Sequence, residues 1–121
     1  MSHKVNGLPR KDRLYEQQSF HEAFTSGRRL HCPYGLFLIK KNNIEHSRAG
    51  AVISKKNIKK AVQRNCLKRL FREWFRLHKR SLPGLDLVFL VKRGFTFSEM
   101  VDCGEKLIQY AKNSNLLNSR I

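Results

Sequence analysis

The chain has 121 residues, of which 40% are hydrophobic, and 25 Lys and Arg against 9 Asp and Glu give a formal net charge of +16. This is one domain's length with enough apolar material for a core, which excludes a disordered basic tail and favours a polyanionic partner. No stretch approaches the roughly 18 apolar residues of a membrane span, and the first residues lack the apolar stretch of a signal peptide.

The chain begins with a segment of mixed charge and a short helix. Residues 1–12 and 114–121 are expected to be flexible ends of a single domain spanning 1–121. The stretch Ser19-Phe20-His21-Glu22 is a capping box, and it predicts a helix that runs to about residue 26. Phe20 and Phe24 are four residues apart and therefore share one face of this helix.

Strands are predicted next. Residues 34–39 follow Pro33 and form an apolar run that predicts a strand, with a turn from residue 41. Residues 49–53 predict a second strand, and residues 28–32 a short edge strand. Alternation along the first of these places Tyr34, Leu36, Leu38 and Lys40 on one face, and Phe37 and Ile39 on the other.

The second half of the chain predicts helix, strand and helix. Residues 57–80 are strongly helical and end at Leu82-Pro83-Gly84. The run 87–91 is continuously apolar, as in a strand covered on both faces. Thr96 and Glu99 cap a last helix. The fold class is therefore α+β, a single two-layer domain with a four-stranded sheet and three helices, in the order α-β-β-β-α-β-α.

The charge is concentrated in the long helix and the loop before it. Residues 55–80 hold 11 basic residues and Glu73, a net +10, whereas residues 1–50 carry +5 and residues 81–121 carry +1. At 100° per residue, an apolar face contains Cys66, Leu67, Leu70, Phe71, Trp74, Phe75 and Leu77. Ile58 and Val62 fall on the basic side and do not fit this division.

The basic face of the helix has three interpretations. A merely solvated face usually mixes acids and bases, and here Glu73 is the only acid. A membrane-surface helix is less simple, because the large aromatic residues suit the core of a folded domain. Lysines at a helix N-terminus oppose the macrodipole, but together with its backbone N–H groups they would bind phosphates.

The segment Asn57–Arg69 resembles the signature helix of the bacterial ribonuclease P protein family. Further likeness lies in Ala51–Lys56, Arg13-Leu14, the pattern Ser19-Phe20-x-x-Ala23-Phe24-x-x-Gly27, and Pro83–Val88. The resemblance covers roughly residues 10–112. One departure is Cys66, which stands where the family commonly has a second Arg, so this position is in doubt as an RNA contact.

The resemblance implies an accessory subunit of a catalytic RNA that removes the 5′ leader of precursor tRNA and leaves a 5′-phosphate. The RNA would supply the active site with Mg²⁺, and no metal site in the protein alone is predicted. The protein would stabilise the RNA fold, bind the leader and lower the demand for metal ions. The resemblance also implies that the basic helix lies in a left-handed crossover between two strands.

Two RNA-binding surfaces are predicted. The surface for the catalytic RNA comprises Lys55, Lys56, Lys59, Lys60, Arg64, Asn65, Lys68, Arg69 and Arg72. The resemblance places a leader-binding cleft between the first helix and one sheet face, formed by Phe20, Phe24, Arg28, Tyr34, Leu36, Leu38 and Lys40. An equally open interpretation places Phe20 and Phe24 in the core, since a Phe pair at this spacing is usually buried.

The residues offer no catalytic cluster. The five histidines are scattered, the nine acids are dispersed, and the three cysteines are widely spaced, which favours a reducing cytoplasm. We expect no membrane association and a protein that is monomeric apart from RNA. The alternatives are a small ribosomal protein that binds rRNA and a helix-turn-helix DNA-binding protein, although strands on both sides of the long helix disfavour the latter.

Overall fold

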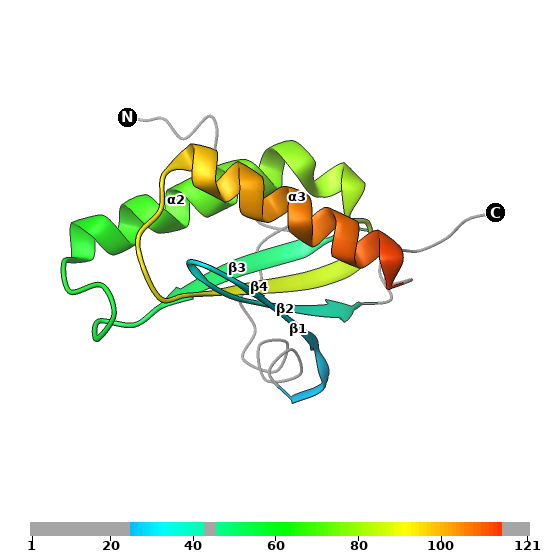
Figure 1. The fold of residues 1–121 in the computed structure, drawn as a ribbon, viewed down its shortest axis with the longest axis horizontal. Helices are drawn as coiled ribbons and strands as arrows, with labels where there is room; N and C mark the ends of the chain where they lie inside the picture. Colours follow the sequence, from blue (N-terminus) through cyan, green and yellow to red (C-terminus); the bar gives the residue numbers. More distant parts are fainter. Residues whose placement is uncertain (1–24, 43–45, 115–121) are drawn as a thin grey trace.

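The structure, a computed structural model, describes residues 25–42 and 46–114, which form a sheet with two long helices on one face (Figure 1). The elements are β1 Arg28–Cys32, β2 Gly35–Lys41, β3 Arg48–Ile53, α2 Ala61–His78, a 3-10 turn Lys79–Ser81, β4 Leu85–Val91 and α3 Phe97–Asn113. The predicted first helix, with Phe20 and Phe24, lies outside the described residues except for Thr25 and Ser26, which are helical.

The four strands lie in the order β1-β2-β4-β3. β1 and β2 form an antiparallel hairpin, β2 is antiparallel to β4, and β3 is parallel to β4. The predicted edge strand 28–32 is thus confirmed. The other two early strands were predicted too short: β2 continues to Lys41, which pairs with Leu85, and β3 begins at Arg48, which pairs with Asp86.

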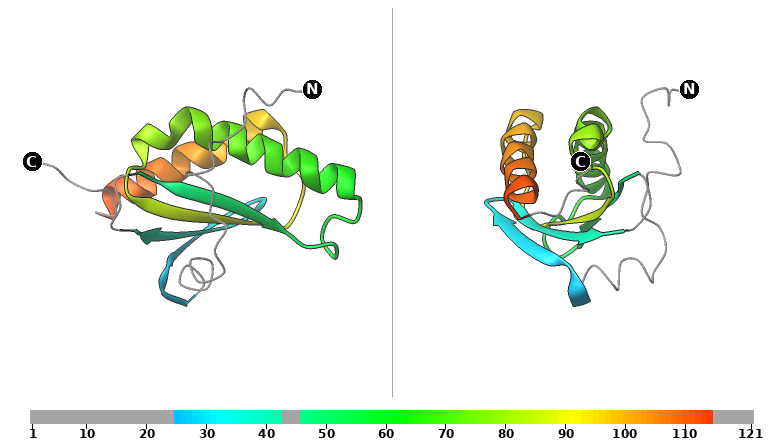
Figure 2. Two further views of the ribbon diagram at one scale, coloured as in Figure 1. Left: turned by 180° about the vertical axis from the view of Figure 1, so that it is seen from behind. Right: turned by 90° about the vertical axis from the view of Figure 1, so that its right-hand side faces the viewer.

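Helix α2 connects the two parallel strands and makes a left-handed crossover. With the helices above the sheet, β3 and β4 both run to the left in Figure 1, and β4 lies in front of β3, as the end-on view in Figure 2 also shows. About 98% of such connections are right-handed, so this hand is unusual. It agrees with the hand that the resemblance implies.

The core lies between the sheet and the helices. Phe37 stacks on Phe89 with ring centroids 4.3 Å apart, and Phe71 of α2 lies 5.5 Å from Phe89. Leu36 and Leu38 form a separate buried cluster with Val88 on the other face of the sheet. The predicted alternation within this strand is therefore confirmed, and β4 is buried on both faces as predicted.

Tyr34 does not share the face of Leu36 and Leu38, which corrects the prediction. It lies in the turn between β1 and β2, where strand alternation no longer applies. On the helix side its ring packs edge-on with that of Phe95, with ring centroids 6.1 Å apart. A hydrogen bond to Glu99, together with partial burial, raises the pKa of the Tyr34 hydroxyl.

A buried polar network ties the start of β3 to the start of β4. Asp86 is only 6% exposed, and its two oxygens accept hydrogen bonds from Arg48 at 2.9 and 2.7 Å and one from Asn42 at 3.0 Å. Nearby, the Ser47 hydroxyl donates to the Leu82 carbonyl. A buried carboxylate is tolerated when it is paired in this way, and the network fixes the register of the parallel pair.

Two glycines are required by their positions. Gly84, in the turn before β4, has a φ of 74°, a conformation that side-chain-bearing residues rarely adopt. Gly104 lies where α3 crosses α2, and a Cβ there would overlap the Trp74 ring. The close contact between the helices therefore depends on this glycine. The predicted end of the long helix at Leu82-Pro83-Gly84 agrees with the turn observed there.

Candidate nucleic-acid interface

Helix α2 divides into a buried and an exposed face much as the periodicity predicts. Phe71, Trp74 and Phe75 have no exposed surface and Leu67 is 4% exposed. The edges of the predicted apolar face are wrong, however, because Cys66 is exposed and Leu77 is 54% exposed. The sheet and helix α3 together cover the centre of the predicted apolar face and leave its margins exposed to solvent.

The helix begins later than predicted. It was expected from residue 57, but Lys60 has extended backbone angles (φ −85°, ψ 127°) and the first helical residue is Ala61. Before it, the backbone N–H groups of Asn57 and Ile58 both bond to the Ser54 carbonyl in a turn. Ile58 is 6% exposed and belongs to the core cluster, so its misfit on the helical wheel was the signal that it lies outside the helix.

Arg64 holds this loop against the helix. Its terminal Nη1 donates to the carbonyls of Ile58 at 2.8 Å and Lys59 at 2.9 Å. The sequence predicted only an RNA contact for Arg64 and not this role, since no local pattern indicates a bond across a loop. The guanidinium has five N–H donors, so donors remain for a phosphate while the loop stays anchored.

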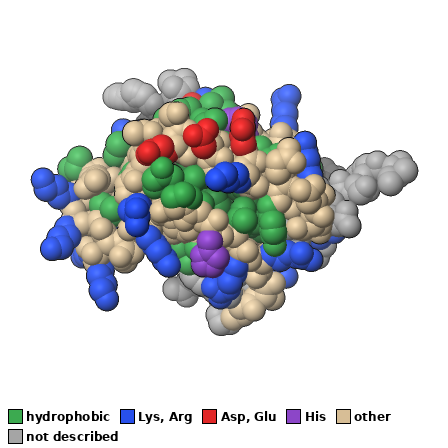
Figure 3. Space-filling model, in the orientation of Figure 1, with side chains coloured by type: hydrophobic (Ala, Val, Ile, Leu, Met, Phe, Trp, Pro, Cys, Tyr) green, Lys and Arg blue, Asp and Glu red, His purple; other side chains and the backbone are tan. Residues whose placement is uncertain are grey.

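The loop and the helix start together form a strongly positive end of the molecule. Lys55, Lys56, Lys59 and Lys60 are all exposed. The first turn of α2 contains no acid and has no side-chain cap, so its N-terminal N–H groups lack the usual side-chain acceptor. Figure 3 shows Lys and Arg side chains projecting from this end of the molecule, on the left in that view.

The positive surface of the loop continues along α2 as a basic stripe, which four residues of this helix form. Asn65, Arg69 and Arg72 are exposed and Lys68 is half-buried, so all four face outward beside the loop lysines. Farther along, Arg76 donates to Glu73, with its Nη2 2.6 Å from a carboxylate oxygen, and this contact lowers the pKa of Glu73. Glu73 thus neutralises part of the stripe after Arg72, and the most positive region is the first half of the helix.

The predicted leader cleft is only partly assembled by the described residues. Lys40 is half-buried and shares one sheet face with Leu36 and Leu38, which are buried. Arg28 is exposed on the edge strand, but it pairs with Ile39 and therefore lies on the helix face, which corrects its place in the predicted cleft. Tyr34 points to the helix side and does not join this group.

The described residues contain no group of three or more His, Cys, Asp or Glu placed to hold a metal ion. Burial, with the neighbouring Cys32 thiol, raises the pKa of the Cys103 thiol to about 12, which leaves it protonated and unreactive. None of the helices in the described ranges is long and apolar enough to cross a membrane.

Comparisons with known proteins identify the family. The family model described as Ribonuclease P matches residues 8–114. The ribonuclease P protein component of Proteus mirabilis is 43% identical over 87 residues, which are 72% of this chain and 73% of that protein. The same protein of Pectobacterium atrosepticum is also 43% identical, with the same coverage.

Solved structures agree. The ribonuclease P protein of Thermotoga maritima superposes with a TM-score of 0.71 at 30% identity, over 81% of this chain and 96% of that one. The Staphylococcus aureus protein has a TM-score of 0.73 at 26% identity, over 84% and 95% of the two chains. The ribosomal-protein alternative finds no support, and the chain belongs to the ribonuclease P protein component family, as the RNA-binding subunit of this tRNA-processing enzyme.

Proposed function

We propose that the loop 54–60 and the outward face of α2 bind the catalytic RNA subunit, and that this RNA carries out the cleavage. The observation that supports this most directly is the separation of α2 into a fully buried aromatic face and an outward face rich in Lys and Arg. A structured polyanion can lie along such a face without disturbing the core.

Two kinds of cation serve two roles at this surface. Arginine presents a planar fork that suits two-point contact with a phosphate, which fits Arg69 and Arg72 on successive parts of the helix. The loop lysines act as mobile point charges beside the N–H groups of the helix start. Arg64 connects the two parts, since it holds the loop through the carbonyls of Ile58 and Lys59.

The chemistry is assigned to the RNA. Hydrolysis that leaves a 5′-phosphate on the mature tRNA would use Mg²⁺ held by RNA ligands, and the protein would assist by neutralising phosphates that otherwise need metal ions. This assignment follows the family resemblance. We further expect the protein to be monomeric apart from RNA and to act in the cytoplasm.

We also propose that the 5′ leader of precursor tRNA lies against the sheet face opposite the helices. Lys40 shares this face with the buried pair Leu36 and Leu38, and Arg29, which pairs with Leu38, adds a second positive residue there. A single strand is commonly bound where positive charge borders an apolar surface. Phe20 and Phe24 remain the predicted helix side of this cleft, whereas Tyr34 and Arg28 are no longer included.

The test is cleavage of precursor tRNA by the reconstituted holoenzyme at low Mg²⁺, compared with the RNA subunit alone. The double variant Lys68→Ala, Arg69→Ala should bind the RNA subunit at least tenfold more weakly. The slope of log affinity against log salt concentration should be shallower by about two, one unit for each lost phosphate contact.

The matched control is Lys106→Ala with Lys112→Ala, which removes two exposed lysines from α3. It should stimulate cleavage as the wild type does. If the wild-type protein does not stimulate cleavage at all, the proposed function is wrong; if both double variants lose affinity equally, the binding surface is wrong.

A further inference from the structure

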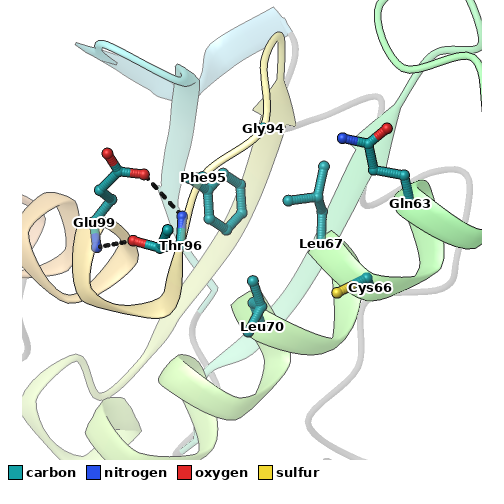
Figure 4. Close-up of a pocket in the computed structure, with 8 residues that line it drawn as sticks. All are labelled: Gln63, Cys66, Leu67, Leu70, Gly94, Phe95, Thr96 and Glu99. Carbon is teal, nitrogen blue, oxygen red and sulfur yellow. Dashed lines mark hydrogen bonds between the residues drawn. The ribbon is translucent and has the colours of Figure 1, made fainter.

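A groove of about 360 Å³ lies beside the first half of α2, between this helix and the segment that joins β4 to α3 (Figure 4). It lies beside the stripe assigned to phosphate binding, and no role described above uses it. Its lining comes from two elements that are far apart in sequence, around Gln63–Leu70 and Gly94–Glu99.

The floor of the groove is apolar and its rim is polar. Figure 4 shows Leu67 and Leu70 extending from α2 toward Phe95 on the opposite wall. The exposed amide of Gln63 and the hydroxyl of Thr96 lie on the two rims. An apolar pocket with a few hydrogen-bonding groups at its edge suits a flat heteroaromatic ring, which is apolar on its faces and polar on its edges.

The apolar character extends onto the neighbouring surface. Val62 is 81% exposed and Cys66, one turn later on the same side of α2, is also exposed. Val62 was one of the two residues that did not fit the helical wheel, and unlike Ile58 it gains no burial from the fold. A hydrophobic side chain in the first turn of a basic helix fits a surface that receives an apolar group from a partner.

The charge around the groove favours RNA as that partner. Lys92 and Arg93 immediately precede Gly94 on one wall, and Arg69 lies on α2 between Cys66 and Leu70; all three are exposed. Among the described residues of the lining, only Glu99 is acidic, and its carboxylate already accepts hydrogen bonds from the Thr96 backbone at 2.8 Å and from Tyr34. The site therefore combines a slot for a ring with flanking cations for phosphates.

We propose that this groove takes one unstacked nucleobase of the bound RNA, with the phosphates on either side of that nucleotide against Lys92, Arg93 and Arg69. The proposal rests on the proposed function, in that the RNA must already lie along α2. It adds a contact that recognises a base splayed out of the RNA, whereas the basic stripe recognises the backbone.

The test fills the groove without changing its charge. Gln63→Trp adds a large ring at one rim, and Gln109→Trp makes the same change at an exposed glutamine of α3. Gln63→Trp should weaken binding to the RNA subunit about 5- to 150-fold, the range for loss of a stacked base, while Gln109→Trp matches the wild type. The slope of log affinity against log salt should remain that of the wild type in both, because no phosphate contact is lost.

Cys66→Trp fills the groove from another lining position and guards against failure of the first variant to fold; thermal melting of each protein alone checks the fold. Equal affinity of Gln63→Trp and Gln109→Trp would overturn the proposal. So would a shallower salt slope, which would mean that the substitution had disturbed the phosphate contacts. A lower melting temperature with unchanged RNA affinity would overturn it too, because the groove would then matter to the stability of the fold and not to RNA binding. Failure of the wild-type protein to bind RNA would be a different result, and would refute the proposed function itself.

Discussion

Helices α2 and α3 have 18 and 17 residues and pack on the same face of one sheet, yet they begin in opposite ways. At the start of α3, the Thr96 hydroxyl accepts from the Glu99 backbone at 3.2 Å and the Glu99 carboxylate accepts from the Thr96 backbone at 2.8 Å. At the start of α2, Lys60 occupies the N-cap without a capping bond, and the first turn has no acid.

This difference agrees with the proposed binding role of α2, since only the start of α3 carries the usual stabilising contacts. A capping box satisfies two backbone donors and places a negative charge at the positive end of the macrodipole. Helix α2 has neither feature, so the N–H groups and lysines at its start remain available to anions. The stabilisation that α2 lacks at its start is offset by its buried face, where Phe71, Trp74 and Phe75 have no exposed surface.

The strongest test of this view disturbs the contact that both helices share. Gly104→Ala places a methyl group against the Trp74 ring, so we expect a loss of up to about 3 kcal/mol in the free energy of unfolding. Chemical denaturation measures it. Ser98→Ala, at an exposed position of the same helix, is the control and should change stability by less than about 0.5 kcal/mol. A stable Gly104→Ala protein would mean that the two helices separate easily.

The next effect concerns the anchored loop. Arg64→Ala removes the bonds to the Ile58 and Lys59 carbonyls, and we expect it to release the loop with its four lysines. RNA affinity should fall at least tenfold, and the salt slope should flatten by more than the single unit expected for Lys68→Ala. Filter binding at several salt concentrations measures both. Equal slopes for the two variants would mean that Arg64 contributes one phosphate contact and no loop anchoring.

Exchanging the N-cap residues of α2 and α3 should change the free energy of unfolding by a smaller amount, and in opposite directions for the two helices. Lys60→Thr supplies α2 with a capping side chain and should stabilise the protein by about 0.5–1 kcal/mol while weakening RNA binding a few-fold. Thr96→Lys removes the cap of α3 and should lower the free energy of unfolding by about 1 kcal/mol. Paired melting and binding curves check this, and the comparison fails if both changes shift stability in the same direction.

The smallest effect is a pH dependence confined to α3. The hydrogen bonds from the Thr96 backbone and Tyr34 hold the pKa of Glu99 below its ordinary value of about 4.5. When folding lowers the pKa of a carboxyl group, the group stabilises the fold fully at any pH above its pKa in the unfolded chain. This stabilisation is lost as the pH falls through the pKa of the group in the folded protein. Glu99→Gln should therefore lose less stability than the wild type as the pH falls below about 4.5, and the two should follow the same pH dependence above it. Identical acid-unfolding curves would argue against a stabilising role for this carboxylate.

Much of the interface could be predicted because it depends on local pattern. Residues of one helix share a face by their spacing, so the basic stripe from Lys68 to Arg72 follows from counting, as does the cap formed by Thr96 and Glu99. The alternation of Leu36 and Leu38 against Phe37 and Ile39 is local in the same sense. The assignment of the family also came from a contiguous motif.

What the sequence by itself determined is therefore where the charge lies, which residues alternate, and which family the signature helix belongs to. Only the tertiary structure decided that Ile58 leaves the helix for the core, that Arg64 bonds back across the loop, and that Tyr34 turns toward Phe95 and Glu99. The groove between Leu70 and Phe95 was likewise decided only by the tertiary structure. Periodicity records neighbours along the chain, whereas each of these contacts joins segments that meet only when the sheet and both helices have packed.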